Sequence, residues 1–251
     1  MSLDHLLCIG KKIIRLDDCL STNAYAKNLS AKSTPIEGTT IITANQTAGK
    51  GQYGNTWQST AHKNLTFSVL IHPKMLSPNE QFYISIMTSL ACVSFLEKMS
   101  EKSFQIKWPN DIYHKDKKIG GILIENQLQQ RQITQSIIGI GLNINQEKFE
   151  NLPQAISLTQ IEGKIFTIEK CYEAILIELD KYYLQLRQGK QQELLNQYYQ
   201  KMLGYQEQRK FIKNNEQFEA KVEGISPTGE LHLITKGTSS FFGFKEVEWI
   251  F

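Results

Sequence analysis

The 251-residue chain is long enough for one large domain with a small appendage around a sizeable core. Its 41% hydrophobic and 21% charged residues exclude a disordered chain, and a net charge of +3 is too small to indicate nucleic acid as the main partner. The cysteines and histidines show no metal-ligand spacing, and no signal peptide or run of 18 apolar residues occurs, which predicts a reduced, cytoplasmic protein without zinc or membrane contact.

The first half of the chain alternates β-rich runs with helical segments. Strands are predicted at 12–15, 40–44 and 65–71. The strand at 65–71 alternates apolar and polar residues, as a half-buried strand does. Ser21, Thr22 and Asn23 can cap a helix, because such side chains accept hydrogen bonds from the first free N–H groups. Residues 77–80 form a capping box that opens a second, long helix.

The second half continues with strands, then helices, then strands again. A strand is predicted at 104–107, followed by a hairpin of 119–126 and 133–144 joined by 128–132. Helices are predicted at 168–187 and 191–203, and Gly204 is placed to end the second one. From residue 205 onward the helical period disappears and turn signals separate short strands, which predicts a small β-barrel.

A glycine-rich loop follows the strand at 40–44. Gly49, Gly51 and Gly54 let backbone N–H groups approach an anion, and Lys50 adds a positive charge. The loop matches neither a P-loop nor a dinucleotide fingerprint. The segment alone is more typical of an ordinary surface loop.

Two further segments carry charged residues near strand ends. In Lys107-Trp108-Pro109-Asn110-Asp111 the proline ends a strand, which leaves Lys107, Asn110 and Asp111 at its end, although a surface ion pair is the plainer interpretation. Lys118 precedes an apolar strand with Gly120 and Gly121, where a pocket or a β-bulge with a solvated lysine is possible.

Gly139 and Gly141 alternate along a strand, so one face of it is bare. A ligand or a neighbouring element has to fill that space. Trp57 could stack on a base or belong to the core.

Taken in order, these segments resemble biotin–protein ligases over almost the whole chain. The resemblance is carried by 21–23, 46–57, 107–111, 118–125 and 139–143, and K-W-P-N-D followed by K-x-x-G-I-L-x-E is its most specific part. It implies an α+β fold: a class II tRNA synthetase-like catalytic domain (1–204) with a mixed sheet and flanking helices, and an SH3-like barrel (205–251). It also implies activation of biotin by ATP to biotinyl-5′-AMP, then transfer to a lysine of a biotin carboxyl carrier protein domain, with Mg²⁺ accompanying ATP.

The resemblance also implies roles for single residues. The catalytic residues would be Lys118, Lys50, Asp111 and Lys107. Biotin would contact Ser21, Thr22, Asn23, Gln46, Gly49, Gly121, Gly139 and Gly141. ATP and the adenylate would contact Lys50, Gln52, Trp57, Asn110, Lys118 and Asn143. No residues are assigned to the metal.

The chain departs from the usual bacterial pattern in two respects. The loop that commonly reads G-R-G-R-R-G carries Lys50, Gln52 and Tyr53 at its arginine positions, which predicts weaker retention of the adenylate. No room for a helix-turn-helix exists before Lys11, so no operator DNA binding is expected. The strand at 133–144 could pair with a second copy at a sheet edge, which makes a homodimer possible.

Two alternatives stay open at this point. A lipoate–protein ligase would share fold and chemistry, but lipoate has no ureido ring for Ser21, Thr22 and Gln46 to bind. A non-catalytic module, with a barrel that recruits a partner, is disfavoured by the low net charge and by the intact Lys107, Asp111 and Lys118.

Overall fold

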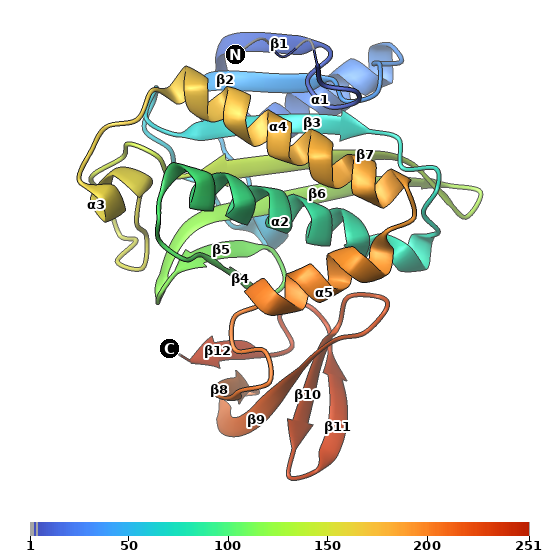
Figure 1. The fold of residues 1–251 in the computed structure, drawn as a ribbon, viewed down its shortest axis with the longest axis vertical. Coiled ribbons are helices and arrows are strands. Elements are labelled where there is room, and N and C mark those ends of the chain that lie inside the picture. Colours follow the sequence, from blue (N-terminus) through green and yellow to red (C-terminus); the bar gives the residue numbers. More distant parts are fainter. Residues whose placement is uncertain (1–2, 4, 251) are drawn as a thin grey trace.

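The computed structural model describes residues 3 and 5–250, apart from the side chain of Tyr53. Within this part a large α+β unit, built on a seven-stranded sheet, is followed by a small five-stranded β unit (Figure 1). The chain passes from one to the other through Gly204, whose φ of 72° is readily adopted by glycine. We propose that the domain boundary falls at this turn.

The large sheet is mixed, as predicted. Its strands are β1 (Ile13–Cys19), β2 (Thr40–Gln46), β3 (Leu65–Ile71), β4 (Gln105–Lys107), β5 (Asp111–His114), β6 (Lys117–Gln129) and β7 (Gln132–Leu142). They lie in the order β1-β2-β3-β7-β6-β5-β4. Only the β1–β2 pair is parallel among these described strands.

Helices cover both faces of this sheet. They are α1 (Thr22–Lys32), α2 (Phe82–Met99), α3 (Leu158–Glu162), α4 (Ile168–Arg187) and α5 (Gln191–Lys201), with short 3-10 turns η1 (Gln52–Gly54) and η2 (Pro78–Glu80). Figure 1 shows α2 and α4 crossing one face, whereas α1 lies behind the sheet. Ser21 caps α1 as predicted, because its Oγ accepts from the Ala24 N–H at 3.4 Å. We call the face that carries α1 the site face.

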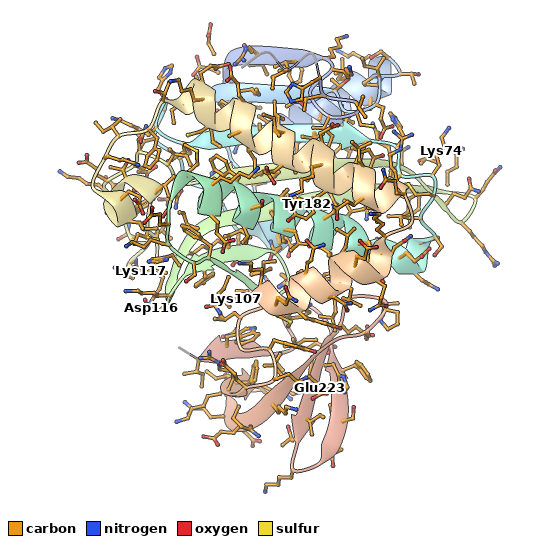
Figure 2. All side chains as sticks on the ribbon, viewed as in Figure 1. Lys74, Lys107, Asp116, Lys117, Tyr182 and Glu223 are labelled. Atoms are coloured by element: carbon orange, nitrogen blue, oxygen red, sulfur yellow. The ribbon has the colours of Figure 1, made fainter. Side chains whose placement is uncertain are left out.

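Helix α2 forms the centre of the core. By length and composition alone the segment Pro78–Met99 could cross a membrane, but 67% of its most apolar window is buried inside the protein, as in a core helix. Tyr182 of α4, which is 7% exposed, lies in the layer between α4 and α2 (Figure 2). The predicted capping box of Ser77 and Glu80 caps the start of η2, which lies directly before α2.

The two faces of β3 differ in chemistry. The Phe67 ring packs edge-on against Tyr172 of α4, with 5.6 Å between ring centroids. Ser68 points to the site face, where its Oγ lies 2.7 Å from Thr22 Oγ1. The strand is buried along its whole length, so the predicted half-burial is wrong. The reason is that helices cover both faces of the sheet.

Two sequence-based expectations about the hairpin need correction. Strands β6 and β7 extend to Gln129 and from Gln132, so the connection is only Gln130 and Arg131, both with positive φ. Strand β7 lies between β3 and β6 from Ser136 to Leu142. The predicted edge pairing with a second copy is therefore wrong for this stretch, because both of its sides already carry hydrogen-bonded strands.

The small unit is an antiparallel sheet, in agreement with the predicted β-barrel. Its strands are β8 (Gln208–Lys213), β9 (Glu216–Ile225), β10 (Leu231–Thr235), β11 (Thr238–Phe242) and β12 (Glu248–Ile250), in the order β11-β10-β9-β8-β12. It is joined to the large unit by a buried hydrogen bond, in which the Trp108 indole N–H donates to the Gly229 carbonyl at 2.8 Å. The small unit therefore sits directly beside the Lys107–Asp111 segment.

Candidate active site

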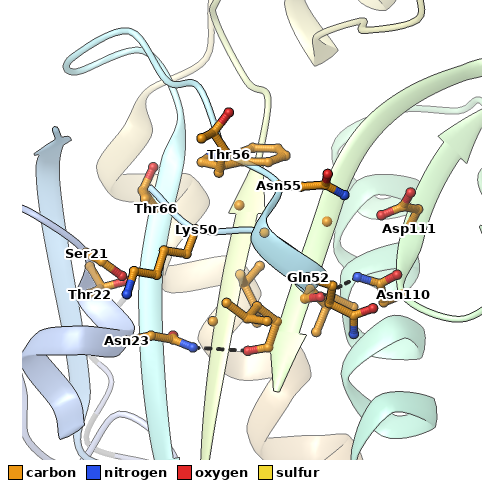
Figure 3. Close-up of a pocket in the computed structure, with 18 of the residues that line it drawn as sticks. Ser21, Thr22, Asn23, Lys50, Gln52, Asn55, Thr56, Thr66, Asn110 and Asp111 are labelled. Atoms are coloured by element: carbon orange, nitrogen blue, oxygen red, sulfur yellow. Dashed lines mark hydrogen bonds between the residues drawn. The ribbon is translucent and has the colours of Figure 1, made fainter. Parts of the chain in front are cut away.

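A cavity of about 140 Å³ lies on the site face, between the start of α1, the glycine loop and strands β6 and β7 (Figure 3). We call it the inner cavity. Most of the predicted site residues line it: Ser21, Thr22, Asn23, Gln46, Lys50, Gln52, Trp57, Asn110, Asp111, Lys118, Gly121, Gly139 and Gly141. Segments that are far apart in the sequence thus meet at one place.

One end of the inner cavity is polar and held rigidly. The Gln46 Oε1 accepts from the backbone N–H of Thr22 at 2.9 Å and lies 3.3 Å from the Thr22 hydroxyl. Ser68 Oγ lies within hydrogen-bond distance of both Thr22 Oγ1 and Asn23 Oδ1, at 2.7 and 2.6 Å. These contacts fix the side chains that would meet a polar ring, so the site is organised before any ligand enters.

The bare face of β7 is filled by side chains of the protein itself. A Cβ on Gly139 would lie 2.4 Å from Asn23 Oδ1, and a Cβ on Gly141 would lie 2.4 Å from the Trp57 ring. Both distances are shorter than any real contact, so only glycine lets Asn23 and Trp57 lie flat on this strand. The glycines shape the site through these two side chains.

The opposite end of the inner cavity is charged. Lys118 Nζ lies 2.6 Å from Asp111 Oδ1, and both side chains are partly exposed to the cavity. Register places Asp111 of β5 opposite Gly121 of β6, where a Cβ would only touch the pair, at 3.4 Å from Lys118 Nζ and 3.5 Å from Asp111 Oδ1. Asn110 fixes the same turn, because its amide donates to the Ile122 carbonyl at 2.6 Å.

The glycine loop folds into a compact turn over the cavity. The Gly51 N–H donates to the Asn55 carbonyl at 2.7 Å, and the Trp57 N–H donates to the Gly49 carbonyl at 3.0 Å. Gly49 itself does not line the inner cavity; a Cβ there would lie 2.4 Å from the Trp57 carbonyl oxygen. Figure 3 shows Lys50 extending toward Ser21 and Thr22, on the side away from Asp111.

A second cavity, of about 260 Å³, adjoins the inner one and is lined by Trp57, Lys118, Tyr113 and Asn143. We call it the side cavity. The indole Nε1 of Trp57 and the Oδ1 of Asn143 are buried without a hydrogen-bond partner. An unpaired buried polar atom costs about 1–3 kcal/mol, so a ligand that pairs with these atoms would gain affinity. Asn143 thus lies in the side cavity rather than the inner one.

Lys107 is placed differently from the other predicted catalytic residues. It lines neither cavity, and its Nζ lies 5.4 Å from the centroid of the Tyr113 ring. Burial is the main cause that lowers the Lys107 pKa, with Asp111 opposing and Lys118 adding to the shift. Its catalytic role stays a prediction.

Sequence reasoning missed several residues at the site. Ser68 and Thr66 lie in an otherwise apolar strand. The alternation of polar and apolar residues in this strand could have indicated that both face the site. Phe244, between β11 and β12, also lines the inner cavity, and its ring centroid lies 6.0 Å from that of Trp108. Nothing in the local sequence around Phe244 indicates this contact, because the packing of two separate units creates it.

The described residues contain no cluster of three or more side chains able to hold a metal ion. In the described part of the inner cavity, Asp111 is the one carboxylate, and Lys118 already neutralises it. The residues therefore do not fit a metal site built by the protein alone.

Comparisons with known proteins agree with this geometry. The chain resembles a biotin protein ligase from Aquifex aeolicus, solved in complex with biotin and ATP, with a TM-score of 0.79 and 27% identity over 95% of this chain and 98% of that one. It is 32% identical over 181 residues to the bifunctional ligase/repressor BirA of Bacillus subtilis, covering 70% of this chain and 54% of the relative. It is 29% identical over 175 residues to the biotin–[acetyl-CoA-carboxylase] ligase of Mycobacterium tuberculosis, covering 68% and 64%.

The fold is thus that of the biotin protein ligases. The sequence model of the biotin/lipoate A/B protein ligase family matches residues 18–143, about half of the chain and most of the inner cavity. The chain belongs to this family. It spans about half the length of the BirA relatives that it matches.

Proposed function

We propose that this protein activates biotin with ATP and transfers the biotinyl group to a lysine of a biotin carboxyl carrier protein domain. One observation carries the proposal: Lys118, paired with Asp111, lines both the polar inner cavity and the side cavity. A cation shared by two adjoining cavities can neutralise two anions that must react. The names of the relatives from Mycobacterium tuberculosis and Aquifex aeolicus support biotin as the acid.

The inner cavity suits a small acid with one polar ring. Thr22, Asn23 and Gln46 offer donors and acceptors that their mutual hydrogen bonds already orient. Preorganised polar groups lower the entropic penalty of binding. The acid's carboxylate would then lie at the other end, beside Lys118.

In the first step a carboxylate oxygen of biotin attacks the α-phosphorus of ATP. The new P–O bond forms the mixed anhydride biotinyl-5′-AMP, and the bond to the β-phosphate oxygen breaks to release pyrophosphate. Negative charge accumulates on the phosphorus oxygens in the transition state, so a fixed ammonium such as Lys118 stabilises it more than the ground state. Lys50 is proposed to add a second positive charge from the loop, with the side chain turned from the orientation seen in Figure 3.

The side cavity is proposed to hold the adenine. Trp57 offers its ring face and Asn143 its unpaired Oδ1, which can accept from an exocyclic amine. Asn110 is proposed to act by fixing the turn, since its amide already donates to Ile122. Mg²⁺ would neutralise phosphate charge when bound.

In the second step the carrier lysine, as a free amine, attacks the acyl carbon of the adenylate. The amide bond forms, the bond to the phosphate oxygen breaks, and AMP leaves. The amine has to lose a proton, and Asp111 is the carboxylate of the described cavity that could orient it or take that proton. Binding of AMP's phosphate to Lys118 would release Asp111 for this role.

Exchange of labelled pyrophosphate into ATP, dependent on added biotin, tests the proposal. Lipoate is the comparison acid, because a lipoate–protein ligase would exchange with lipoate instead. Stabilisation by biotin and ATP without any exchange would instead favour a binding module. The absence of operator DNA binding stays a prediction, for which a mobility-shift assay is the measurement.

A further inference from the structure

The inner cavity is one part of a longer depression between α1 and the β6–β7 hairpin. On β6 Leu123 lines the inner cavity, and Glu125, two residues further on, lines a neighbouring pocket. On β7 Gly139 lines the inner cavity and Ile137 the neighbouring pocket. Residues two apart on a strand point to the same face. The two pockets therefore follow one another along the site face.

Helix α1 shows the same succession. Its first residues, Thr22 and Asn23, line the inner cavity, whereas Lys27 and Ser30 line the neighbouring pocket. This pocket is an open depression of about 590 Å³, compared with about 140 Å³ for the inner cavity. We call it the outer trough. It offers much more room than the cavity in which the acid is proposed to bind.

A polar pair stands between the two spaces. The Asn23 amide donates to Glu125 Oε2 at 2.8 Å and to the Leu123 carbonyl at 3.3 Å. Asn23 Oδ1 lies 2.6 Å from the Ser68 hydroxyl, and the side chain rests on Gly139. Contacts on all these sides fix the amide, which is 3% exposed. We call this pair the Asn23–Glu125 wall.

We propose that the Asn23–Glu125 wall sets the length of the acid that this protein can activate. The inference rests on the proposed function and deepens it. The reacting carboxylate lies at the Lys118 end, so the ring at the far end of the acid meets Asn23. The wall blocks a substituent on that ring, and opening the wall admits the substituent to the outer trough.

The outer trough also indicates which substituents would fit. Its walls combine the apolar Ile137 with Lys27, Ser30 and Gln135. A short alkyl chain ending in a polar group matches this lining. The ligand class is therefore a biotin that carries such a chain on a ureido nitrogen.

The test compares kcat/KM for biotin and for N-alkylated biotin in the pyrophosphate exchange reaction. The wild type should prefer biotin by at least about tenfold, because an extra group on the ring would collide with the Asn23–Glu125 wall. Glu125→Ala should reduce this preference, and Asn23→Ala/Glu125→Ala should reduce it further, by about tenfold or more in total. Glu125→Gln is the matched control: it keeps an acceptor for Asn23 and should retain the wild-type preference.

The outcomes separate the wall from the proposed function. A wild type that exchanges no pyrophosphate with biotin overturns the proposed function, and the inference with it. If the wild type is active with biotin but the variants keep the same preference for biotin over N-alkylated biotin, only the proposed role of the Asn23–Glu125 wall is overturned. If the double variant does not fold, Glu125→Ala decides by the same ratio, because Glu125 lies at an exposed position.

Discussion

The Lys118 ammonium lies 2.6 Å from the Asp111 carboxylate, at the place where the inner cavity and the side cavity meet. The pair neutralises itself while no ligand is bound. A biotin carboxylate and a phosphate that arrive together offer Lys118 more negative charge than Asp111 alone. The ammonium is therefore expected to turn from Asp111 to the ligands, which frees the carboxylate for the second step.

Lys118→Ala should lower biotin-dependent pyrophosphate exchange by about 10²–10³-fold in kcat, as removal of a single stabilising donor does at other sites. Lys117→Ala is the matched control, because Lys117 is the exposed neighbour on the same strand and should leave the rate unchanged. Equal losses in the two variants would mean that the rate depends on the positive charge of this region and not on the position of the Lys118 ammonium.

Gly139→Ala and Gly141→Ala should separate the two ligands. The new Cβ at 139 collides with Asn23 and should weaken biotin, whereas the new Cβ at 141 collides with Trp57 and should weaken ATP. Overpacking of this kind costs about 1–3 kcal/mol, or roughly 5- to 150-fold in affinity. Isothermal titration with each ligand measures the split, and each variant is the control for the other. A uniform loss for both ligands in both variants would contradict the assigned positions.

Much of the site could be predicted, because its residues lie in short segments whose structure depends on neighbouring residues in the sequence. Short-range rules predict three features: the capping of α1 by Ser21, the end of β4 before Trp108, and the glycine loop. The resemblance of the ordered segments to one family then predicted that they belong to a single site. What could not be predicted depends on register and on contact between distant segments. Gly139 and Gly141 indicated a filled face, but not that Asn23 and Trp57 fill it.

The central position of β7 was missed for the same reason. Its apolar run is equally compatible with an edge and with the middle of a sheet, and only pairing with β3 and β6 decides between them. Strand β5 was not predicted, because its polar end residues Asp111 and His114 leave only two apolar residues between them. Phe244 reaches the inner cavity through docking of the small unit, which no local pattern encodes.

The lowered pKa of Lys107 predicts a dependence of stability on pH. Between the pKa of the folded state and the ordinary value of 10.5, the unfolded chain holds a proton that the folded chain has released. Stability then rises with pH, since the unfolded state binds more protons. The free energy of unfolding of the wild type, relative to Lys107→Met, should therefore rise as pH increases toward 10.5 and be constant well below this window. Urea titrations at several pH values measure the difference, and a decrease over the window would contradict the burial of the charge.

Trp108→Phe should lower the free energy of unfolding by about 1–3 kcal/mol, because it leaves the buried Gly229 carbonyl without its donor. Trp249→Phe is the matched control. The Trp249 indole N–H is buried without a partner, so its removal should be less destabilising for the same change in ring size. Urea denaturation of both variants measures the comparison. A larger loss for Trp249→Phe would mean that the contact between the two units contributes little.

Gln52→Arg tests the departure of the glycine loop from the arginine-rich pattern. The Gln52 Oε1 is buried at the inner cavity without a hydrogen-bond partner, so this position is available to a ligand-facing donor. A guanidinium would give the adenylate a charged hydrogen bond worth about 1.5–3 kcal/mol, and should slow adenylate release roughly ten- to a hundredfold. The dissociation rate of preformed biotinyl-5′-AMP is the measurement. Gln52→Glu places a negative charge at the same position and should accelerate release of the adenylate. An unchanged dissociation rate in both variants would show that this loop position does not contact the intermediate.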